Sequence, residues 1–248
     1  MHPILLSIGT VNIYSYGVML ALSFFIAALW IYRKAPFFEV DPDKMIDLIF
    51  GILIFGLIGA RVLHVFLDKA YYFKYPIEIL KLHKGGLSVQ GGMVFGLIFS
   101  VVFLKKHNVD FWTTGDLFAP FIALGQAIGR IGCFFNGCCY GTVTSSWAGV
   151  LFPGHDLFVH PTQIYASLSL MLIFIVLLIL QNKRMFQKEL LLIYIMLYSV
   201  QRIAVDAFRT NISMTSSGIS VGQWISVIFF IFAIGVLLWK NKSNINTN

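Results

Sequence analysis

The sequence predicts an all-α polytopic membrane protein with about seven transmembrane helices. Hydrophobic residues make up 58% of the 248 residues and charged residues only 12%, and the mean hydropathy is +0.82. Soluble domains carry about 25% charged residues, so this chain has too few charges to cover a water-facing surface. Apolar windows of about 20 residues, the length that crosses a bilayer, recur along the chain. These observations exclude a soluble enzyme, a disulfide-stapled secreted domain and a disordered chain.

Seven apolar windows indicate where the chain crosses the membrane. They cover residues 12–32, 45–67, 87–104, 115–134, 161–180, 189–208 and 219–239. We expect the first window to remain as a helix and not to be cleaved as a signal peptide, because no Lys or Arg precedes it and it is too long for the apolar core of such a peptide. We expect one integral membrane domain over residues 1–248.

The basic residues predict the orientation of the chain. The formal net charge is +7. With seven spans, ten Lys and Arg residues fall in the loops and tail on the side of the C-terminus, and five fall on the other side. Positively charged loops stay on the cytoplasmic side, so we expect the N-terminus outside and the C-terminus in the cytoplasm. The sequence contains no basic patch interleaved with polar residues, the pattern that would indicate nucleic-acid binding. We therefore expect no nucleic-acid partner.

Two connections between the spans differ from ordinary loops. Residues 68–86 place aromatic side chains beside lysines, which is typical of an arm at the membrane interface. Residues 135–160 are rich in Gly, Ser and Thr and carry almost no charge, and we expect them to form an extracytoplasmic loop. The segment Gly85 to Gly92 holds two glycine pairs around Ser88 and Gln90. This composition indicates irregular backbone lining a cavity, because irregular backbone in a membrane is tolerated only there or inside protein.

Three arginines, Arg61, Arg130 and Arg202, fall inside the predicted spans, where a charged side chain costs about 2.5–3.5 kcal/mol on insertion scales. Arg202, Asp206 and Arg209 are spaced by four and three residues, so they share one helical face. They could form a self-neutralising cluster, yet the single aspartate leaves one guanidinium group unpaired. A phosphate would balance that charge, because guanidinium binds phosphate through parallel hydrogen bonds.

All three cysteines of the chain, Cys133, Cys138 and Cys139, lie in segment 129–141 at the end of the fourth span. Backbone N–H groups there could accept an anion beside Arg130. The thiols could be inert apolar groups, could form a Cys133–Cys138 disulfide on an oxidising side, or could form a metal or nucleophilic site. The spacing Cys-x4-Cys-Cys does not match the usual zinc pattern, so we expect no metal.

At these residues the sequence resembles the prolipoprotein diacylglyceryl transferase family. Segment 129–141 keeps much of that family's Gly-Arg-x-Gly-Asn-Phe-x-Asn-x-Glu-x-x-Gly signature, including Arg130, Asn136 and Gly141. Other matches follow the family's order along nearly the whole chain: Tyr16 in the first span, Gly59-Ala60-Arg61 in the second, Gly85 to Gly92, His160 to Tyr165, Arg202 to Arg209, and Gly222-Gln223. The resemblance implies seven spans with an outer N-terminus.

Beside Ala166, which replaces an acidic residue of the family's pattern, and Asp206, which shortens its Glu, three departures matter most. The family's loop histidine is Gln90 here, and the signature's first Asn and its Glu are Cys133 and Cys138. Glutamine cannot accept a proton near neutral pH as an imidazole does. The resemblance therefore implies the lipid-binding scaffold more directly than it implies the proton-transfer step.

The family's reaction moves diacylglycerol from phosphatidylglycerol to the thiol of a lipobox cysteine in a prolipoprotein, so that a thioether forms and glycerol phosphate leaves. The resemblance implies such a transferase in the bacterial cytoplasmic (inner) membrane, needing no cofactor and no metal. Its partners would be phosphatidylglycerol, prolipoprotein signal peptides and membrane lipid. The alternative is a relative that binds phospholipid but uses a different acceptor or is catalytically silent. A transporter would also bury arginines, but it would more often show inverted repeats, and the sequence shows none.

The resemblance and the charge pattern together give two sets of expected site residues. The expected catalytic residues are Tyr16, Gln90, Arg130, Asn136, His160 and Arg202. Those expected to bind phosphatidylglycerol are Arg61, Arg130, Gly141, Arg202, Asp206 and Arg209. We expect Arg130 and Arg202 to clamp the phosphate, since stabilising a leaving anion is often the largest catalytic contribution. Either His160 or Asp206 replaces the missing imidazole, or the arginine field alone favours the thiolate.

Overall fold

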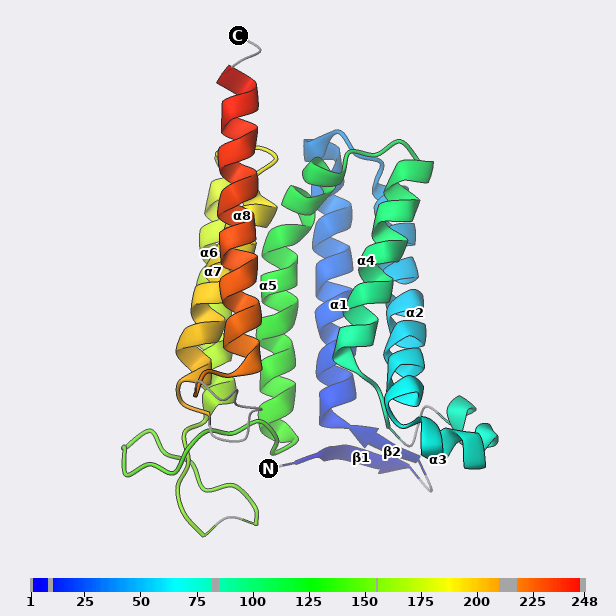
Figure 1. Ribbon diagram of the computed structural model, residues 1–248, viewed down its shortest axis with the longest axis vertical. Helices are drawn as coiled ribbons and strands as arrows, with labels where there is room; N and C mark the ends of the chain where they lie inside the picture. Colours follow the sequence, from blue (N-terminus) through cyan, green and yellow to red (C-terminus); the bar gives the residue numbers. More distant parts are fainter. Residues whose placement is uncertain (1, 9–10, 82–84, 155, 210–217, 246–248) are drawn as a thin grey trace. The chain divides into compact units, whose positions relative to one another are not determined.

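The protein is mostly helical in the computed structural model, which describes residues 2–8, 11–81, 85–154, 156–209 and 218–245 (Figure 1). The chain divides into two compact units. The larger unit comprises residues 1–30 and 115–248, and the smaller unit comprises residues 31–114.

The larger unit combines a β-hairpin with long helices. Its described elements are β1 (Ile4–Ile8), β2 (Val11–Tyr14), most of α1 (Ser15–Lys34), most of α5 (Phe111–Phe135), α6 (Thr162–Asn182), α7 (Leu190–Asp206) and α8 (Val221–Ile245). Helix α7 packs between α6 and α8 (Figure 1). The β-hairpin and the long connection between α5 and α6 lie at the same end of this unit.

One face of α5 joins the core of the larger unit. Ala119, Ala123 and Ala127 recur every four residues and are fully buried, together with Leu170 and Leu177 of α6. Small side chains let helix backbones approach closely in lipid, where packing rather than the hydrophobic effect holds helices together. This close packing fixes α5, whose C-terminal end carries the signature segment.

Two side-chain hydrogen bonds join α5 to its neighbours in this unit. The Ser167 hydroxyl donates to the backbone carbonyl of Ala127 at 2.9 Å, and the Tyr194 hydroxyl donates to Gln126 Oε1 at 2.9 Å. An unpaired polar group in hydrocarbon costs several kcal/mol, so these bonds fix the contacts that α5 makes with α6 and α7.

The β-hairpin corrects the predicted start of the first span. The predicted span was 12–32, but Val11–Tyr14 is a strand and the helix begins at Ser15. The Ser15 N–H donates to the carbonyl of Pro3 at 3.0 Å, and its hydroxyl donates to the carbonyl of His2 at 2.5 Å. A hydropathy window cannot distinguish a short apolar strand from the first turn of a membrane helix, which explains the error.

The smaller unit contains two long helices and the segments around them. Its described elements are the end of α1, η1 (Ala35–Phe38), α2 (Pro42–Leu67), α3 (Lys69–Lys74), η2 (Pro76–Leu80), α4 (Val89–Lys106) and the first turn of α5. The predicted third span, 87–104, therefore begins two residues too early. Of the glycine-rich segment, only residues 85–88 are irregular, because α4 already includes the second glycine pair.

Helices α2 and α4 approach each other through glycines. A Cβ added at Gly91 would lie 2.2 Å from the backbone oxygen of Gly59, and one at Gly92 would lie 3.1 Å from that of Gly56. Only glycine allows backbones to come so close. The N–H of Ser88 donates to the carbonyl of Ala60 at 2.9 Å, which holds the segment before α4 against α2.

All seven predicted spans coincide with helices. Among the described residues, six helices are long and apolar enough to cross a membrane, namely α1, α2, α4, α5, α6 and α8. The sixth predicted window corresponds to α7, which has 17 residues. The all-α membrane fold is confirmed.

Candidate functional site

The signature segment ends α5 in a sharp turn that gathers the three cysteines. The Cys138 N–H donates to the carbonyl of Cys133 at 3.2 Å, and Gly137 and Cys139 adopt left-handed backbone with φ of 71° and 68°. Their three sulfur atoms consequently lie within 4.8 Å of one another, with the sulfurs of Cys138 and Cys139 3.7 Å apart. The side chains are half-buried, so the cluster remains reachable from outside.

The start of α6 anchors this turn. The Thr162 hydroxyl donates to the carbonyl of Cys139 at 2.7 Å, and the Gln163 amide donates to the carbonyl of Cys138 at 2.6 Å. Both anchoring side chains are buried, and Gln163 Oε1 has no hydrogen-bond partner within the described residues. Sequence reasoning missed these anchors, although the His-Pro-Thr-Gln segment had pointed to this part of the chain.

Gly141 lies where the signature segment meets the end of α7. A Cβ there would lie 2.4 Å from the backbone oxygen of Phe208 and 2.9 Å from His160 Cβ. The N–H of Gly141 donates to the carbonyl of His160 at 2.8 Å, and the N–H of Thr142 donates to that of Phe208 at 2.8 Å. Gly141 is therefore a packing requirement that brings the ends of α5 and α7 together.

Arg130 lies one turn before the cysteines on α5 and is partly buried. Its guanidinium has no hydrogen bond or ion pair with any residue that the structure describes, and it interacts electrostatically with Cys139 and Tyr16. A Cβ added at Gly132 would lie 3.3 Å from Tyr16 Cδ2, so α1 packs Tyr16 against this end of α5. Tyr16 keeps 40% of its surface exposed, as a group that meets a substrate requires. Asn136 is exposed at the turn.

Arg202, Asp206 and Arg209 form the cluster that their spacing predicted. The side chain of Asp206 is fully buried and forms two ion pairs. Its Oδ2 lies 3.2 Å from Arg202 Nε, and its Oδ1 lies 3.5 Å from Arg209 Nη1. Ser220 Oγ donates to Asp206 Oδ2 at 3.4 Å. One carboxylate faces two guanidinium groups, so the cluster carries a net positive charge. Arg209 Nε is buried and has no hydrogen-bond partner in the described part of the chain.

His160 lies at the same junction. Its Nδ1 is 3.1 Å from the Tyr165 hydroxyl, and its ring meets that of Phe208 edge to face with centroids 5.2 Å apart. The imidazole is therefore oriented, which a proton acceptor requires.

The cysteine cluster favours one thiolate. Hydrogen bonding with the Cys133 and Cys138 thiols holds the pKa of the Cys139 thiol well below its ordinary value, and the charges of Arg209 and Arg130 lower it further. The hydrogen bond from the Thr142 N–H to the Phe208 carbonyl holds the signature segment next to Arg209, beyond the end of α7.

Arg61 and Gln90 belong to the smaller unit. Arg61 is 7% exposed, and its Nε donates to the carbonyl of Ile79 at 2.8 Å while Nη1 donates to those of Gly85 and Gly86 at 2.8 Å. Its Nη2 donates to a further carbonyl in η2. The guanidinium thereby ties η2 and the glycine segment to α2. Gln90 is exposed at the start of α4 and accepts a hydrogen bond from the Ser88 hydroxyl at 2.9 Å.

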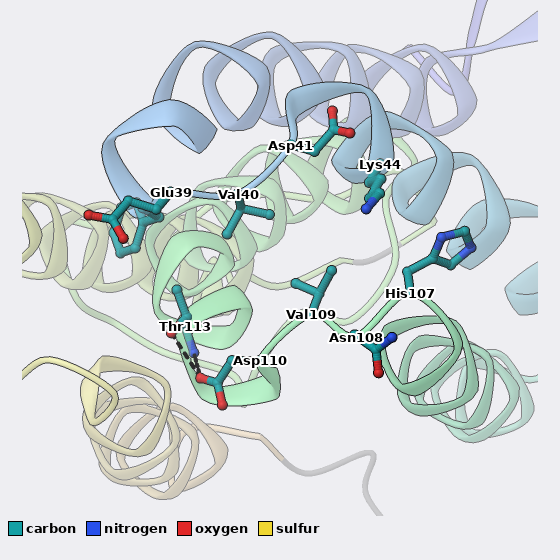
Figure 2. Close-up of a pocket in the computed structure, with 10 residues that line it drawn as sticks. Glu39, Val40, Asp41, Lys44, His107, Asn108, Val109, Asp110 and Thr113 are labelled. Atoms are coloured by element: carbon teal, nitrogen blue, oxygen red, sulfur yellow. Dashed lines mark hydrogen bonds between the residues drawn. The ribbon is translucent and has the colours of Figure 1, made fainter.

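A separate cavity of about 390 Å³ lies at the other end of the smaller unit (Figure 2). It is lined by Phe38, Glu39, Val40, Asp41, Lys44, His107, Asn108, Val109, Asp110 and Thr113. Asp110 caps α5 there, because its carboxylate accepts the N–H and the hydroxyl of Thr113, both at 2.8 Å. None of the predicted site residues lines this cavity, so it is not the predicted site.

These features define a multipass membrane protein that gathers guanidinium groups and a polar turn at the ends of its helices. Among the described residues Arg130 is a partly buried cation without a hydrogen bond or ion pair, and a charged group inside a membrane protein is a candidate functional residue.

Comparison with known proteins names the family. The chain matches the family described as prolipoprotein diacylglyceryl transferase over residues 3–239. It is 32% identical to the phosphatidylglycerol–prolipoprotein diacylglyceryl transferase of Pediococcus pentosaceus over 98% of this chain and 91% of that protein. It is 32% identical to the Finegoldia magna transferase over 99% of this chain and 98% of that protein. It is 28% identical to the Clostridium novyi transferase over 100% of this chain and 99% of that protein. The chain belongs to the prolipoprotein diacylglyceryl transferase family.

Proposed function

We propose that this protein is the transferase that moves diacylglycerol from phosphatidylglycerol to the lipobox cysteine of prolipoproteins. Family membership over nearly the whole chain supports this reaction. The observation that carries it is Arg130, a partly buried guanidinium without a hydrogen bond or ion pair among the described residues. The phosphate of a phospholipid is the anion available to a cation at the lipid surface. The Arg130 guanidinium would hold it through two parallel N–H···O hydrogen bonds.

The phosphate lies, in this proposal, between Arg130 and the cluster at the end of α7. Arg202 is the more accessible arginine of that cluster, with 22% of its side chain exposed against 12% for Arg209. Asp206 holds both in place, so it positions the clamp and need not touch the lipid. As the bond between the glyceryl carbon and the phosphate oxygen breaks, the clamp stabilises the negative charge that builds up on glycerol phosphate.

Two exposed groups near the clamp orient the substrate. We assign headgroup hydrogen bonding to the Tyr16 hydroxyl and the Asn136 amide, because both groups are exposed and both lie close to Arg130 in the fold or along the chain. His160 is oriented by Tyr165 and is our candidate for accepting the thiol proton. Gln90 cannot take that role and is assigned to hydrogen bonding only.

Arg61 acts through position. Its donors already serve backbone carbonyls of η2 and of the glycine segment, so it holds these segments in place instead of contacting phosphate. This assignment differs from the expectation that Arg61 binds the lipid directly.

The reaction takes place, in this proposal, at the outer face of the bacterial cytoplasmic membrane. The bias of Lys and Arg towards the loops on the C-terminal side supports an outer N-terminus. The β-hairpin and the connection at 136–161 share one end of the larger unit (Figure 1). This connection carries the cysteine turn, so the site faces outward. In the same proposal the chain forms one membrane domain, and the arm at 68–86, of which residues 82–84 lie outside the described residues, lies at the membrane interface.

Transfer of diacylglycerol to a lipobox peptide, in vesicles that contain phosphatidylglycerol, tests the clamp. We expect Arg130→Ala to lower the rate by about 100–1,000-fold, as the loss of one donor to a developing anion does, and Arg130→Lys to retain part of it. Arg33→Ala removes an exposed arginine at the other end of α1 and should leave the rate unchanged. Full activity of Arg130→Ala would reject the clamp.

A silent phospholipid-binding relative is the second candidate, because Gln90, Cys133 and Cys138 replace functional residues of the family's pattern. It predicts that vesicles bind the protein but that no peptide is modified under any condition tested.

A further inference from the structure

The cysteine turn carries chemistry that the family's reaction does not use. We propose that Cys133, Cys138 and Cys139 bind a zinc-class divalent ion through three thiolates, and that the ion's fourth position takes the acceptor thiol of the prolipoprotein. The second half of this statement rests on the proposed function. The first half stands on the geometry of the turn alone.

The sulfur positions already fit such an ion. Zinc binds thiolate sulfur at about 2.3 Å in a tetrahedron, so neighbouring sulfurs lie about 3.8 Å apart. The sulfurs of Cys138 and Cys139 are 3.7 Å apart, and all three lie within 4.8 Å. Shifts of an ångström or less in one side chain, Cys133, would therefore complete a three-sulfur site. The linear spacing Cys-x4-Cys-Cys hid this arrangement, because the hydrogen bond from the Cys138 N–H to the Cys133 carbonyl and the left-handed backbone at Gly137 and Cys139 bring the three residues together.

The surrounding structure holds this arrangement in place. The carbonyls of Cys138 and Cys139 are fixed by the buried side chains of Gln163 and Thr162, which belong to the rigid start of α6. Ligands held by packed partners bind metal better than ligands on a free loop, since less ordering is needed on binding.

The charges nearby suit the complex. Three thiolates and one divalent ion carry a net charge of −1, and Arg130 and Arg209 are the cations that interact with Cys139. The three side chains are half-buried, so the ion would retain a side open to an incoming ligand. Three protein ligands with a free fourth position are typical of zinc sites that act on a substrate, whereas structural sites use four.

Such an ion supplies what Gln90 lacks. A thiol that binds zinc is deprotonated, so the acceptor would be held as a thiolate, and its proton would pass to His160, the proton acceptor proposed above. The thiolate sulfur then forms a bond to the glyceryl carbon while the bond from that carbon to the phosphate oxygen breaks. The electron pair of the broken bond leaves with glycerol phosphate. No electrons enter or leave the site, and the three cysteines keep the ion throughout.

Cobalt(II) substitution of the full-length, fully reduced protein in detergent tests the site. We expect one cobalt per chain, with the sulfur-to-cobalt absorption bands and visible bands of a tetrahedral site. Loss of a residue that only supports a metal ligand weakens metal binding by about 10–100-fold. We expect a larger loss of cobalt affinity from each of the three ligand substitutions, Cys133→Ser, Cys138→Ser and Cys139→Ser. Ser145→Ala, in the same connection, should bind cobalt as the parent does.

Three results would overturn the metal site. The first is cobalt binding that survives the three Cys→Ser substitutions together. The second is the absence of cobalt binding by a chain in which all three thiols titrate as free. A disulfide among the three cysteines in protein isolated from cells without reductant would also overturn it, because the thiolates would then be consumed.

A lipobox peptide tests the fourth position. We expect it to shift the visible cobalt bands, whereas the same peptide with serine in place of its cysteine should not. An unchanged spectrum with the cysteine peptide would reject thiol binding. Chelator-treated protein that still transfers diacylglycerol at the full rate would reject the inference and leave the proposed function standing. A cobalt site that responds to the peptide, in a protein that transfers nothing even with zinc, would reject the proposed function instead.

Discussion

Asp206 is the residue on which the charge balance of the site depends. It is fully buried between Arg202 and Arg209, and breaking a buried pair by removing one partner costs about 3–5 kcal/mol. Its shape matters as well as its charge, because a Cβ at Gly222 would lie 2.9 Å from Asp206 Oδ2 and 3.2 Å from Arg202 Nη2. Gly222 thus leaves the space that the ion pair occupies.

Gly222→Ala should displace this ion pair without unfolding the protein. We expect the transfer rate to fall by about 10–100-fold, since small misplacements of catalytic groups cost up to that much, while the thermal midpoint stays within a few degrees. Gly235→Ala lies on the same helix and meets no atom within 4 Å, so it should leave the rate unchanged. Equal rates for the two variants would show that the position of the ion pair is not critical.

Residue chemistry was predictable only where the backbone was regular. The cluster at 202–209 followed from helical spacing alone. The cysteine cluster did not, because its convergence depends on left-handed backbone at Gly137 and Cys139 and on anchors from α6. Neither feature has a signature in the local spacing of the cysteines.

At the scale of elements, α2 and α4 show how the membrane fold is held together. Their glycines bring the two backbones into contact, and the smaller unit relies on this contact because lipid gives no hydrophobic drive to helix pairing.

Gly59→Val should separate these helices. The added Cβ alone would lie 2.4 Å from the Phe95 side chain and 2.5 Å from the backbone oxygen of Gly91. We expect destabilisation of at least about 1–3 kcal/mol, seen as a lower unfolding midpoint in detergent. Gly235→Ala, whose added Cβ meets no atom within 4 Å, is again the control and should leave the midpoint unchanged. An unchanged midpoint for Gly59→Val would contradict the packing of α2 on α4.

The elements themselves were largely predictable from hydropathy, and their ends were not. Long apolar runs located the seven long helices of the described residues, because a membrane helix must satisfy its own backbone over about 20 residues. The hairpin β1–β2 and the starts of α1 and α4 depend on hydrogen bonds such as that from Ser15 to Pro3, which hydropathy does not register.

At the scale of the whole molecule, the proposed reaction requires the cysteine turn to face outward. A protease site inserted after Ser145 should be cut when protease is added to intact spheroplasts, whereas one inserted after Lys183 should be cut only after lysis. The physical reason is the retention of basic loops in the cytoplasm. The reverse pattern would place the site on the wrong side for prolipoproteins.

The central claim is that an unneutralised guanidinium at the end of α5 holds the phosphate of phosphatidylglycerol during transfer. Its most direct test is mass analysis of the N-terminal cysteine of a lipoprotein, in a bacterium depleted of its own transferase. We predict a diacylglyceryl thioether when this chain is expressed and little or none with Arg130→Ala at equal protein level. An unmodified cysteine with the parent chain, or full modification with Arg130→Ala, would contradict the claim.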